Sequence, residues 1–100
     1  MPVMKIRDAK IADVPRINSL ISSHAEVDRM LFRSIADIYD NLQTFVVAEE
    51  NGQVIGCGAL QVVWSDLAEI KSLAVDAGHI GRGIGTAMVE RLVQKARQAG

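Results

Sequence analysis

The chain has 100 residues, of which 49% are hydrophobic and 23% are charged, with eight glycines and two prolines. This composition is typical of one packed domain near the lower end of the usual size range and argues against a disordered chain. A net charge of −1 at pH 7, with basic residues scattered along the chain, argues against a nucleic-acid partner.

Membrane spans, disulfides and metal clusters also lack support in the sequence. The longest apolar runs are shorter than the ~20 residues that cross a bilayer, and the amino terminus does not resemble an export signal. Cys57 is the only cysteine and is expected to be a buried thiol, and the two histidines suggest no metal cluster. We therefore expect residues 1–100 to form a single cytoplasmic domain without a metal.

The first half of the chain shows one strand pattern followed by two helix patterns. Residues 3–7 alternate weakly, as a strand does, and apolar residues over 14–21 recur at helical spacing. Residues 22–33 show no clear period and are expected to form an ordered connection with short helical turns. A capping pattern that begins at Ser34 predicts a second helix ending near Asn41.

Three strand patterns follow, and the first two are separated by a strong turn signal. Residues 44–48 and 54–63 read as strands, and Asn51-Gly52 between them predicts an antiparallel hairpin. Gly56 and Gly58 would weaken the second strand unless a bulge or a close backbone contact occupies that point.

Residues 67–76 read as a third strand of this meander, after a turn at Ser65-Asp66. Its apolar end, Leu73-Ala74-Val75, implies cover on both faces and predicts a central place in the sheet. Apolar residues spaced by four over 84–96 then mark a strongly amphipathic last helix. The predicted order is β-α-α-β-β-β-α, without internal repeats or linkers.

The segment between the last strand and the last helix carries the clearest functional signal. Gly81, Gly83 and Gly85 alternate as the chain enters the helix. Glycines let consecutive backbone N–H groups converge, and a helix start adds unsatisfied donors and a positive dipole end. This arrangement suits a diphosphate, to which Arg82 would add a positive charge.

Three other interpretations of the glycines fit the pattern less well than a diphosphate site. A dinucleotide fingerprint requires G-x-G-x-x-G in a parallel βαβ unit, whereas this pattern is G-x-G-x-G after an antiparallel meander. A Walker A loop requires a closing Gly-Lys-Ser/Thr, which is missing here. A tight strand-to-helix turn alone would need fewer than three alternating glycines.

The segment Ile80-Gly81-Arg82-Gly83-Ile84-Gly85 resembles motif A of the GNAT superfamily of N-acetyltransferases, which follows a strand ending in a Leu-Ala-Val-like triplet. The order of elements also follows this family. The resemblance implies an α+β fold with a mixed sheet, the GNAT acyl-CoA N-acyltransferase fold, and acetyl-coenzyme A as cosubstrate. Ile80 stands where the family has Arg or Gln, which implies weaker coenzyme A binding.

The resemblance also implies roles for single residues. A backbone N–H on the last strand, at Leu73 by register, would stabilise the thioester oxygen as it becomes negative, and Glu69 would be the base that deprotonates the amine. Coenzyme A would be bound by residues from the end of this strand to the start of the helix, namely Leu73, Val75, Ile80, Gly81, Arg82, Gly83, Ile84, Gly85 and Thr86.

The middle of the chain is similar to short bacterial amino-acid acetyltransferases that make N-acetylglutamate. In these enzymes an arginine just before the second helix binds a carboxylate of glutamate, a role suited to a two-pronged donor. Arg33 matches that position, Arg29 is the nearby alternative, and Lys71 is a candidate for the second carboxylate. Two alternatives stay open: a different amine acceptor, and a non-catalytic module that binds acetyl-coenzyme A.

Compared with a complete GNAT domain of ~150 residues, the chain is expected to lack the last third. It would then be either a fragment of a longer enzyme or a naturally short chain. The strand over 67–76 would expose an unpaired edge, which predicts a homodimer or a higher assembly.

Overall fold

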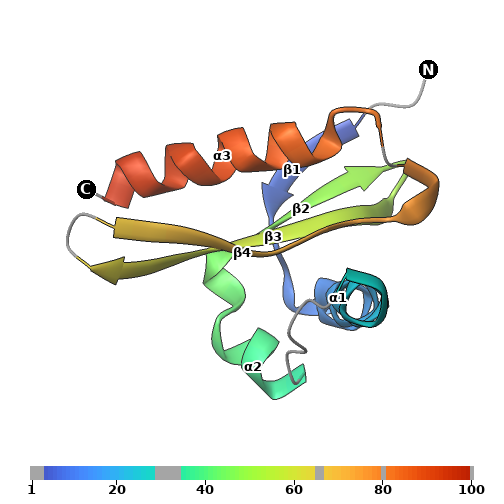
Figure 1. Cartoon of the computed structure of the whole chain (residues 1–100), viewed down its shortest axis with the longest axis horizontal. Coiled ribbons are helices and arrows are strands. Elements are labelled where there is room, and N and C mark those ends of the chain that lie inside the picture. The colour runs from blue at the N-terminus through green and yellow to red at the C-terminus, as the bar shows by residue number, and fades with distance from the viewer. Residues whose placement is uncertain (1–3, 29–34, 65–66, 80, 100) are drawn as a thin grey trace.

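The computed structural model describes residues 4–28, 35–64, 67–79 and 81–99, and it contains one antiparallel sheet with helices on both faces. The strands lie in the order β1 (Met4–Asp8), β2 (Phe45–Glu50), β3 (Gln53–Trp64) and β4 (Leu67–Val75). The helices are α1 (Val14–Asp28), α2 (Ile35–Asp40) and α3 (Ile84–Ala99). Figure 1 shows α3 on one face of the sheet and α1 and α2 on the other. The expected α+β fold is therefore confirmed.

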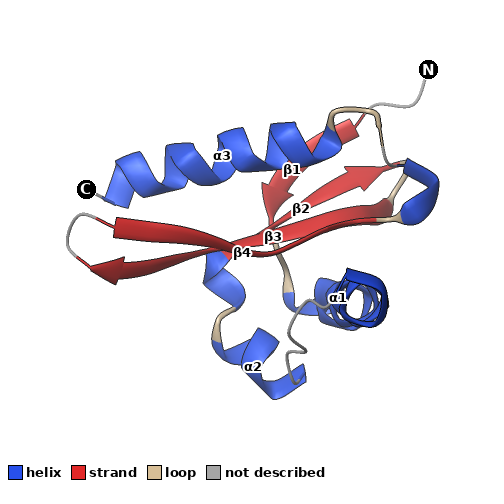
Figure 2. Ribbon diagram, viewed as in Figure 1, coloured by secondary structure: helices blue, strands red, loops and turns tan. Residues whose placement is uncertain are grey.

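Short 3₁₀ turns, drawn in blue like the other helices in Figure 2, lie in connections between a strand and a helix. They are η1 (Ile11–Asp13), η2 (Leu42–Thr44) and η3 (Ala77–His79). None of the helices in the described ranges is both long and apolar enough to cross a membrane.

Two buried clusters, one on each face of the sheet, form the core. Beneath α3, the fully buried side chains of Ile84, Met88 and Leu92 pack with Val46 and Ile55. On the other face, α1 and α2 pack their apolar residues against Phe45, Val47, Cys57 and Ala74 among others. The thiol of Cys57 is buried, as expected, and its Sγ donates to the Ser72 carbonyl oxygen at 3.5 Å.

The first helix is longer than the sequence suggested. Residues 22–33 were expected to form a connection, but α1 continues to Asp28, so this prediction is wrong as far as residue 28. The stretch contains neither proline nor glycine, and extending an existing helix requires only one more ordered residue per hydrogen bond. Residues 29–34 lie outside the described residues. The first strand and the end of α2 at Asp40 agree with the prediction to within one residue.

The hairpin between β2 and β3 forms as predicted. Asn51 and Gly52 both have positive φ angles, 55° and 76°. Two successive left-handed residues are the signature of a type I′ turn, whose twist matches that of paired strands.

Gly56 and Gly58 lie where α3 comes close to β3. A Cβ at Gly56 would lie 2.9 Å from Met88 Cε and 3.3 Å from the Ala74 carbonyl oxygen. A Cβ at Gly58 would lie 3.0 Å from Leu73 Cδ1 and 3.2 Å from Leu92 Cδ1. Both predicted reasons for these glycines, a close contact and a bulge in the pairing, are therefore present.

The last strand is covered on both faces but is not central. Ala74 is buried against the α1 side, and Leu73 and Val75 pack against the α3 side. However, β4 is an edge strand of the described sheet and pairs only with β3 there. The prediction of a central strand was wrong because helices on both faces suffice to make a strand end apolar, even without a second neighbouring strand.

Candidate functional site

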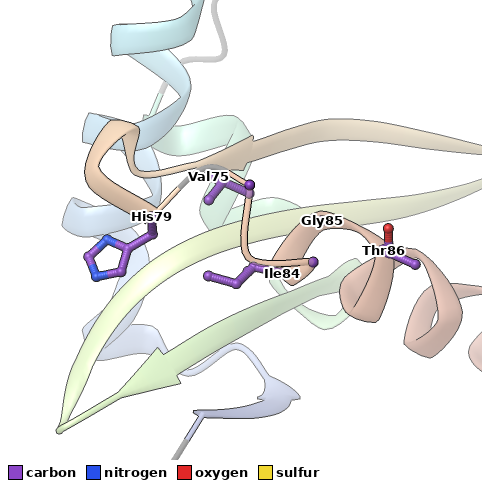
Figure 3. Close-up of a pocket in the computed structure, with 7 residues that line it drawn as sticks. Val75, His79, Ile84, Gly85 and Thr86 are labelled. Atoms are coloured by element: carbon purple, nitrogen blue, oxygen red, sulfur yellow. The ribbon is translucent and has the colours of Figure 1, made fainter. Parts of the chain in front are cut away.

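A pocket of about 290 Å³ lies between the end of β4 and the start of α3. The segment passes from Val75 through the turn η3 and then through Gly81–Gly83, which we call the glycine loop, into the helix, as Figure 3 shows. The pocket is lined by Val75, His79, Gly81, Gly83, Ile84, Gly85 and Thr86. All of these residues except His79 were predicted from the sequence to bind the cofactor.

The glycines of this segment leave open space on the pocket side. Gly81 and Gly83 have φ angles of 89° and 76°, which favour glycine over any other residue. Among the residues that the structure describes, no heavy atom lies within 4 Å of a Cβ built on Gly81, Gly83 or Gly85, apart from the glycine itself, its chain neighbours and its own helix backbone. Gly85 is helical, where glycine costs about 0.5–1 kcal/mol relative to alanine, so protein packing does not explain its presence.

The start of α3 directs backbone donors into the same space. The first hydrogen bond of the helix runs from the Ala87 N–H to the Gly83 carbonyl oxygen, at 3.0 Å. The N–H groups of Ile84, Gly85 and Thr86 precede this bond and have no acceptor within the helix by its geometry. Together with the positive end of the helix dipole, they favour a negatively charged group. The open space beside Gly81, Gly83 and Gly85, which we call the glycine cradle, and these backbone donors together fit a diphosphate.

Arg82 points to a partner within the protein. Its Nη1 donates to Glu50 Oε1 at 3.1 Å, and its Nη2 donates to Glu50 Oε2. Hydrogen bonds from Arg82 hold the pKa of the Glu50 carboxyl below its ordinary value, although desolvation opposes this. The sequence analysis placed Arg82 on the cofactor, and the structure shows its guanidinium bound to this carboxylate.

His79 and Asp76 extend the network around the loop. His79 Nδ1 lies 2.9 Å from Asp76 Oδ2, and this hydrogen bond lowers the pKa of Asp76. Arg16 of α1 donates from Nη2 to Asp76 Oδ1 at 3.4 Å and from Nε to the Val54 carbonyl oxygen at 2.8 Å. No sequence pattern pointed to Arg16 or Glu50, because their partners Asp76 and Arg82 lie 60 and 32 residues away in the chain. Asp76 and His79 are only three residues apart, but no motif marks them.

A bulge interrupts β4 next to the pocket. Cys57 pairs with Ala74 while Ala59 pairs with Lys71, so Gly58 alone lies opposite two residues, Ser72 and Leu73. Ser72 has a φ angle of 56°, the left-handed region typical of a bulge residue. Because a bulge disturbs the ladder of hydrogen bonds, the Leu73 N–H is a candidate donor for a ligand. Its role in stabilising an oxyanion stays a prediction.

Glu69 and Lys71 lie on the other side of this bulge. Both side chains are about half exposed, and Lys71 Nζ lies 3.5 Å from Glu69 Oε2. Lys71 lines a second pocket of about 540 Å³, between α2, β3 and β4. Its other lining residues are Asp37, Asn41, Thr44, Ala59, Leu60 and Gln61, of which the sequence analysis had singled out none for binding.

Three of the proposed site residues cannot be placed. Arg29, Arg33 and Ile80 lie outside the described residues. Among the residues that the structure describes, no group of three or more His, Cys, Asp or Glu side chains is arranged to hold a metal ion.

Comparisons with known proteins agree on one family. Residues 12–100 match the family described as "Acetyltransferase (GNAT) family". An amino-acid acetyltransferase of Mycobacterium tuberculosis is 45% identical over 95 residues, which cover 92% of this chain and 54% of the relative.

Two crystal structures give the same result. A Mycobacterium tuberculosis protein in complex with CoA and NLQ superposes with a TM-score of 0.88 at 44% identity, over 94% of this chain and 58% of that one. N-acetylglutamate synthase from Neisseria gonorrhoeae, in complex with coenzyme A and N-acetyl-glutamate, superposes with a TM-score of 0.92 at 31% identity, over 98% and 23%. The chain therefore spans only part of the length of the relatives that it matches.

Proposed function

Because this chain belongs to the GNAT family of acetyltransferases, we propose that it takes part in the transfer of an acetyl group from acetyl-coenzyme A to the α-amino group of L-glutamate. The glycine cradle carries this proposal, because no atom of the described residues fills the space beside its glycines, and the N–H groups of the first turn of α3 have no acceptor within the helix. The names of its relatives, amino-acid acetyltransferase and N-acetylglutamate synthase, support the choice of acceptor.

The residues of the cradle suit coenzyme A. The N–H groups of the first turn of α3 would bind the diphosphate, and the backbone of Gly81 and Gly83 would approach it closely. Val75, which lines the pocket, and Leu73, on the same strand, would contact the pantetheine arm. When bound, acetyl-coenzyme A supplies the acetyl group as a thioester.

The bulge of β4 is the proposed place of the transfer. Leu73 lies between Val75, which lines the cradle, and Lys71, which lines the second pocket. A Leu73 N–H aimed at the thioester oxygen would stabilise the negative charge that develops there. Glu69, on the same strand, would remove the proton that the amine must lose before it attacks.

The second pocket is the proposed acceptor site. Lys71 supplies a positive charge in it, and Thr44 and Asn41 line it with polar groups. We propose that Lys71 binds one carboxylate of glutamate, and that Arg33, or Arg29 in its place, binds the other.

The edge of β4 in the described sheet is proposed to pair with a second copy of the chain. Light scattering would show this pairing as twice the monomer mass.

Gly85→Ala tests the proposed function most directly. The added methyl group enters open space and improves helix propensity, so the melting temperature should stay the same or rise. The same methyl group would occupy the space of the diphosphate, so the affinity for acetyl-coenzyme A, measured by calorimetry, should fall by roughly tenfold or more.

Gln94→Ala, an exposed change farther along α3, is the matched control and should bind the cofactor as the unaltered chain does. Equal affinity of Gly85→Ala and the unaltered chain would remove the cradle as the cofactor site. If the complete protein binds acetyl-coenzyme A but acetylates no amino acid, this domain is instead a non-catalytic binding module.

A further inference from the structure

Glu50 is a buried carboxylate that faces the glycine loop from a distant part of the chain. It ends β2, directly before the hairpin turn, and only 8% of the residue is exposed. A buried charge is costly unless it is paired and hydrogen-bonded. Arg82 of the glycine loop provides this pairing with both of its terminal nitrogens, so the loop and the end of β2 are joined by a two-pronged contact.

A second connection holds the beginning of the same loop. His79 Nε2 lies 3.9 Å from Glu50 Oε1, while its Nδ1 binds Asp76. Asp76 is in turn bound by Arg16, and its N–H donates to the Ile55 carbonyl oxygen at 2.8 Å. Charged groups on both sides of residue 80 therefore attach the loop to the rest of the protein, through Glu50 of β2 and Arg16 of α1, and a backbone hydrogen bond attaches it to β3.

Two residues of the loop offer no side chain to fix its shape. Gly81 and Gly83 carry none, and among the described residues nothing outside their chain neighbours lies within 4 Å of a Cβ built on either. Glycine loses more conformational freedom on ordering than any other residue. Arg82, which stands between the two, is thus the side chain through which the rest of the protein can hold their backbone.

We propose that Glu50 is a positioning residue that holds the Gly81–Gly83 backbone in its diphosphate-binding conformation by binding Arg82, which acts as a support and not as a phosphate ligand. This inference rests on the proposed function, because it assumes that coenzyme A occupies the cradle. The rival arrangement is that Arg82 leaves Glu50 and binds the phosphates directly. The two differ in sign: removing the Glu50 charge weakens binding in the first case and strengthens it in the second.

Calorimetric titration with coenzyme A separates these cases, using Glu50→Gln, Arg82→Gln and the double variant. We expect each single change to weaken binding by about tenfold, the effect of losing one charged hydrogen bond, and the double variant to bind no more weakly than either single one. Glu90→Gln and Arg97→Gln remove one exposed charge of each sign from α3 and should leave the affinity unchanged.

Tighter or equal binding by Glu50→Gln would overturn the positioning role. Arg82→Gln gives an independent answer, because its side chain is 45% exposed and the change should not unfold the chain. If Arg82 is a support, the affinity for coenzyme A should depend on salt equally in the unaltered chain and in Arg82→Gln. If Arg82 binds the phosphates, the affinity of Arg82→Gln should depend on salt less strongly. If the unaltered chain binds no coenzyme A, the proposed function fails and the inference fails with it. If the unaltered chain binds coenzyme A and the variants bind it equally well, only the inference fails.

Discussion

Gly56, Gly58 and Gly85 are glycines for different physical reasons. At Gly56 and Gly58 a side chain would meet atoms of α3 and β4 at 2.9 to 3.3 Å, so packing between the helix and the sheet requires them. At Gly85 a side chain would meet no atom of the described residues within 4 Å, apart from its chain neighbours and its own helix backbone. Neither packing nor the φ angle requires a glycine there, so Gly85 supports the proposed ligand site in a way that the other two do not.

Glu69 is the residue on which the proposed proton transfer depends. Glu69→Gln keeps the shape and the hydrogen-bonding capacity of the side chain but cannot accept a proton, so kcat should fall by about 100-fold. The dissociation constant of acetyl-coenzyme A should stay the same, because Glu69 does not line the cradle. Release of free thiol from acetyl-coenzyme A in the presence of glutamate measures the first quantity.

The matched control is Glu90→Gln, which removes an exposed carboxylate from α3. Should Glu69→Gln turn over at the same rate as this control, a water molecule or another group would be the base.

At the scale of elements, the bulge in β4 depends on one residue in a left-handed conformation. Ser72 has a φ angle of 56°, which is costly for a β-branched residue. Ser72→Val should therefore lower the free energy of unfolding by about 1–2 kcal/mol, whereas Ser72→Gly should be neutral or stabilising. Urea denaturation of the two variants measures the difference, and a stable Ser72→Val protein would mean that the bulge tolerates a shift in register.

The elements that could be predicted from the sequence are those with local signals. The I′ turn at Asn51-Gly52 and the amphipathic α3 depend on neighbouring residues alone, and both formed as predicted, with α3 running three residues past position 96 to Ala99. The extension of α1 to Asp28 was missed because residues 22–28 lack a clear apolar period, although nothing in them stops a helix. The edge position of β4 was missed because burial by helices and burial by strands leave the same apolar pattern.

The site was predictable to the same degree. The predicted backbone cradle follows from alternating glycines at a helix start, two before α3 and one in its first turn, a pattern visible within a short segment. The contact between Glu50 and Arg82 joins positions 32 residues apart, and nothing near Glu50 distinguishes it from Glu49 in the sequence. The lining of the second pocket likewise combines α2 with two strands, which only the folded chain brings together.

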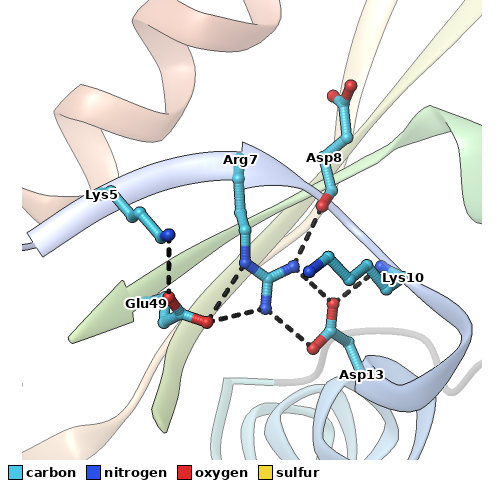
Figure 4. Close-up of polar contacts among 6 residues, drawn as sticks. All are labelled: Lys5, Arg7, Asp8, Lys10, Asp13 and Glu49. Carbon is cyan, nitrogen blue, oxygen red and sulfur yellow. Dashed lines mark hydrogen bonds and ion pairs between the residues drawn. The ribbon is translucent and has the colours of Figure 1, made fainter. Parts of the chain in front are cut away.

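At the scale of the whole molecule, a charged network joins the far edge of the sheet to the first helix. Arg7 of β1 donates to Asp13 at 2.8 and 3.1 Å and to Glu49 of β2 at 3.0 and 3.3 Å, as Figure 4 shows. Asp13 is buried, and its carboxylate also accepts from the Lys10 N–H at 2.7 Å. The network thus holds the start of α1 against β1.

This network predicts a loss of stability in acid. Hydrogen bonds from Arg7 lower the pKa of Asp13 in the folded chain. Its stabilising contribution is therefore complete at neutral pH, begins to decline as the pH falls below about 4, the ordinary value for Asp, and is lost below the folded pKa. Asp13→Asn should lower the free energy of unfolding by about 1–3 kcal/mol at pH 7.

Urea denaturation at a series of pH values measures this contribution. The difference between Asp13→Asn and the unaltered chain should shrink below about pH 4. Asp40→Asn, an exposed change at the end of α2, should follow the unaltered chain at every pH. A constant difference for Asp13→Asn across the range would mean that the carboxylate stabilises the fold without its charge.

The sheet runs β1-β2-β3-β4 in chain order, and α3 follows directly on β4. Everything that shapes the diphosphate cradle, apart from Arg16, therefore comes from one uninterrupted stretch of chain, from β2 to α3. Neighbouring strands joined by short turns close small loops and can assemble early in folding. The second pocket takes Ala59, Leu60, Gln61 and Lys71 from this same stretch and only its α2 side from outside it. The α2 side alone can therefore be redesigned, or exchanged with that of a relative, while the strands that carry the cradle keep their own architecture.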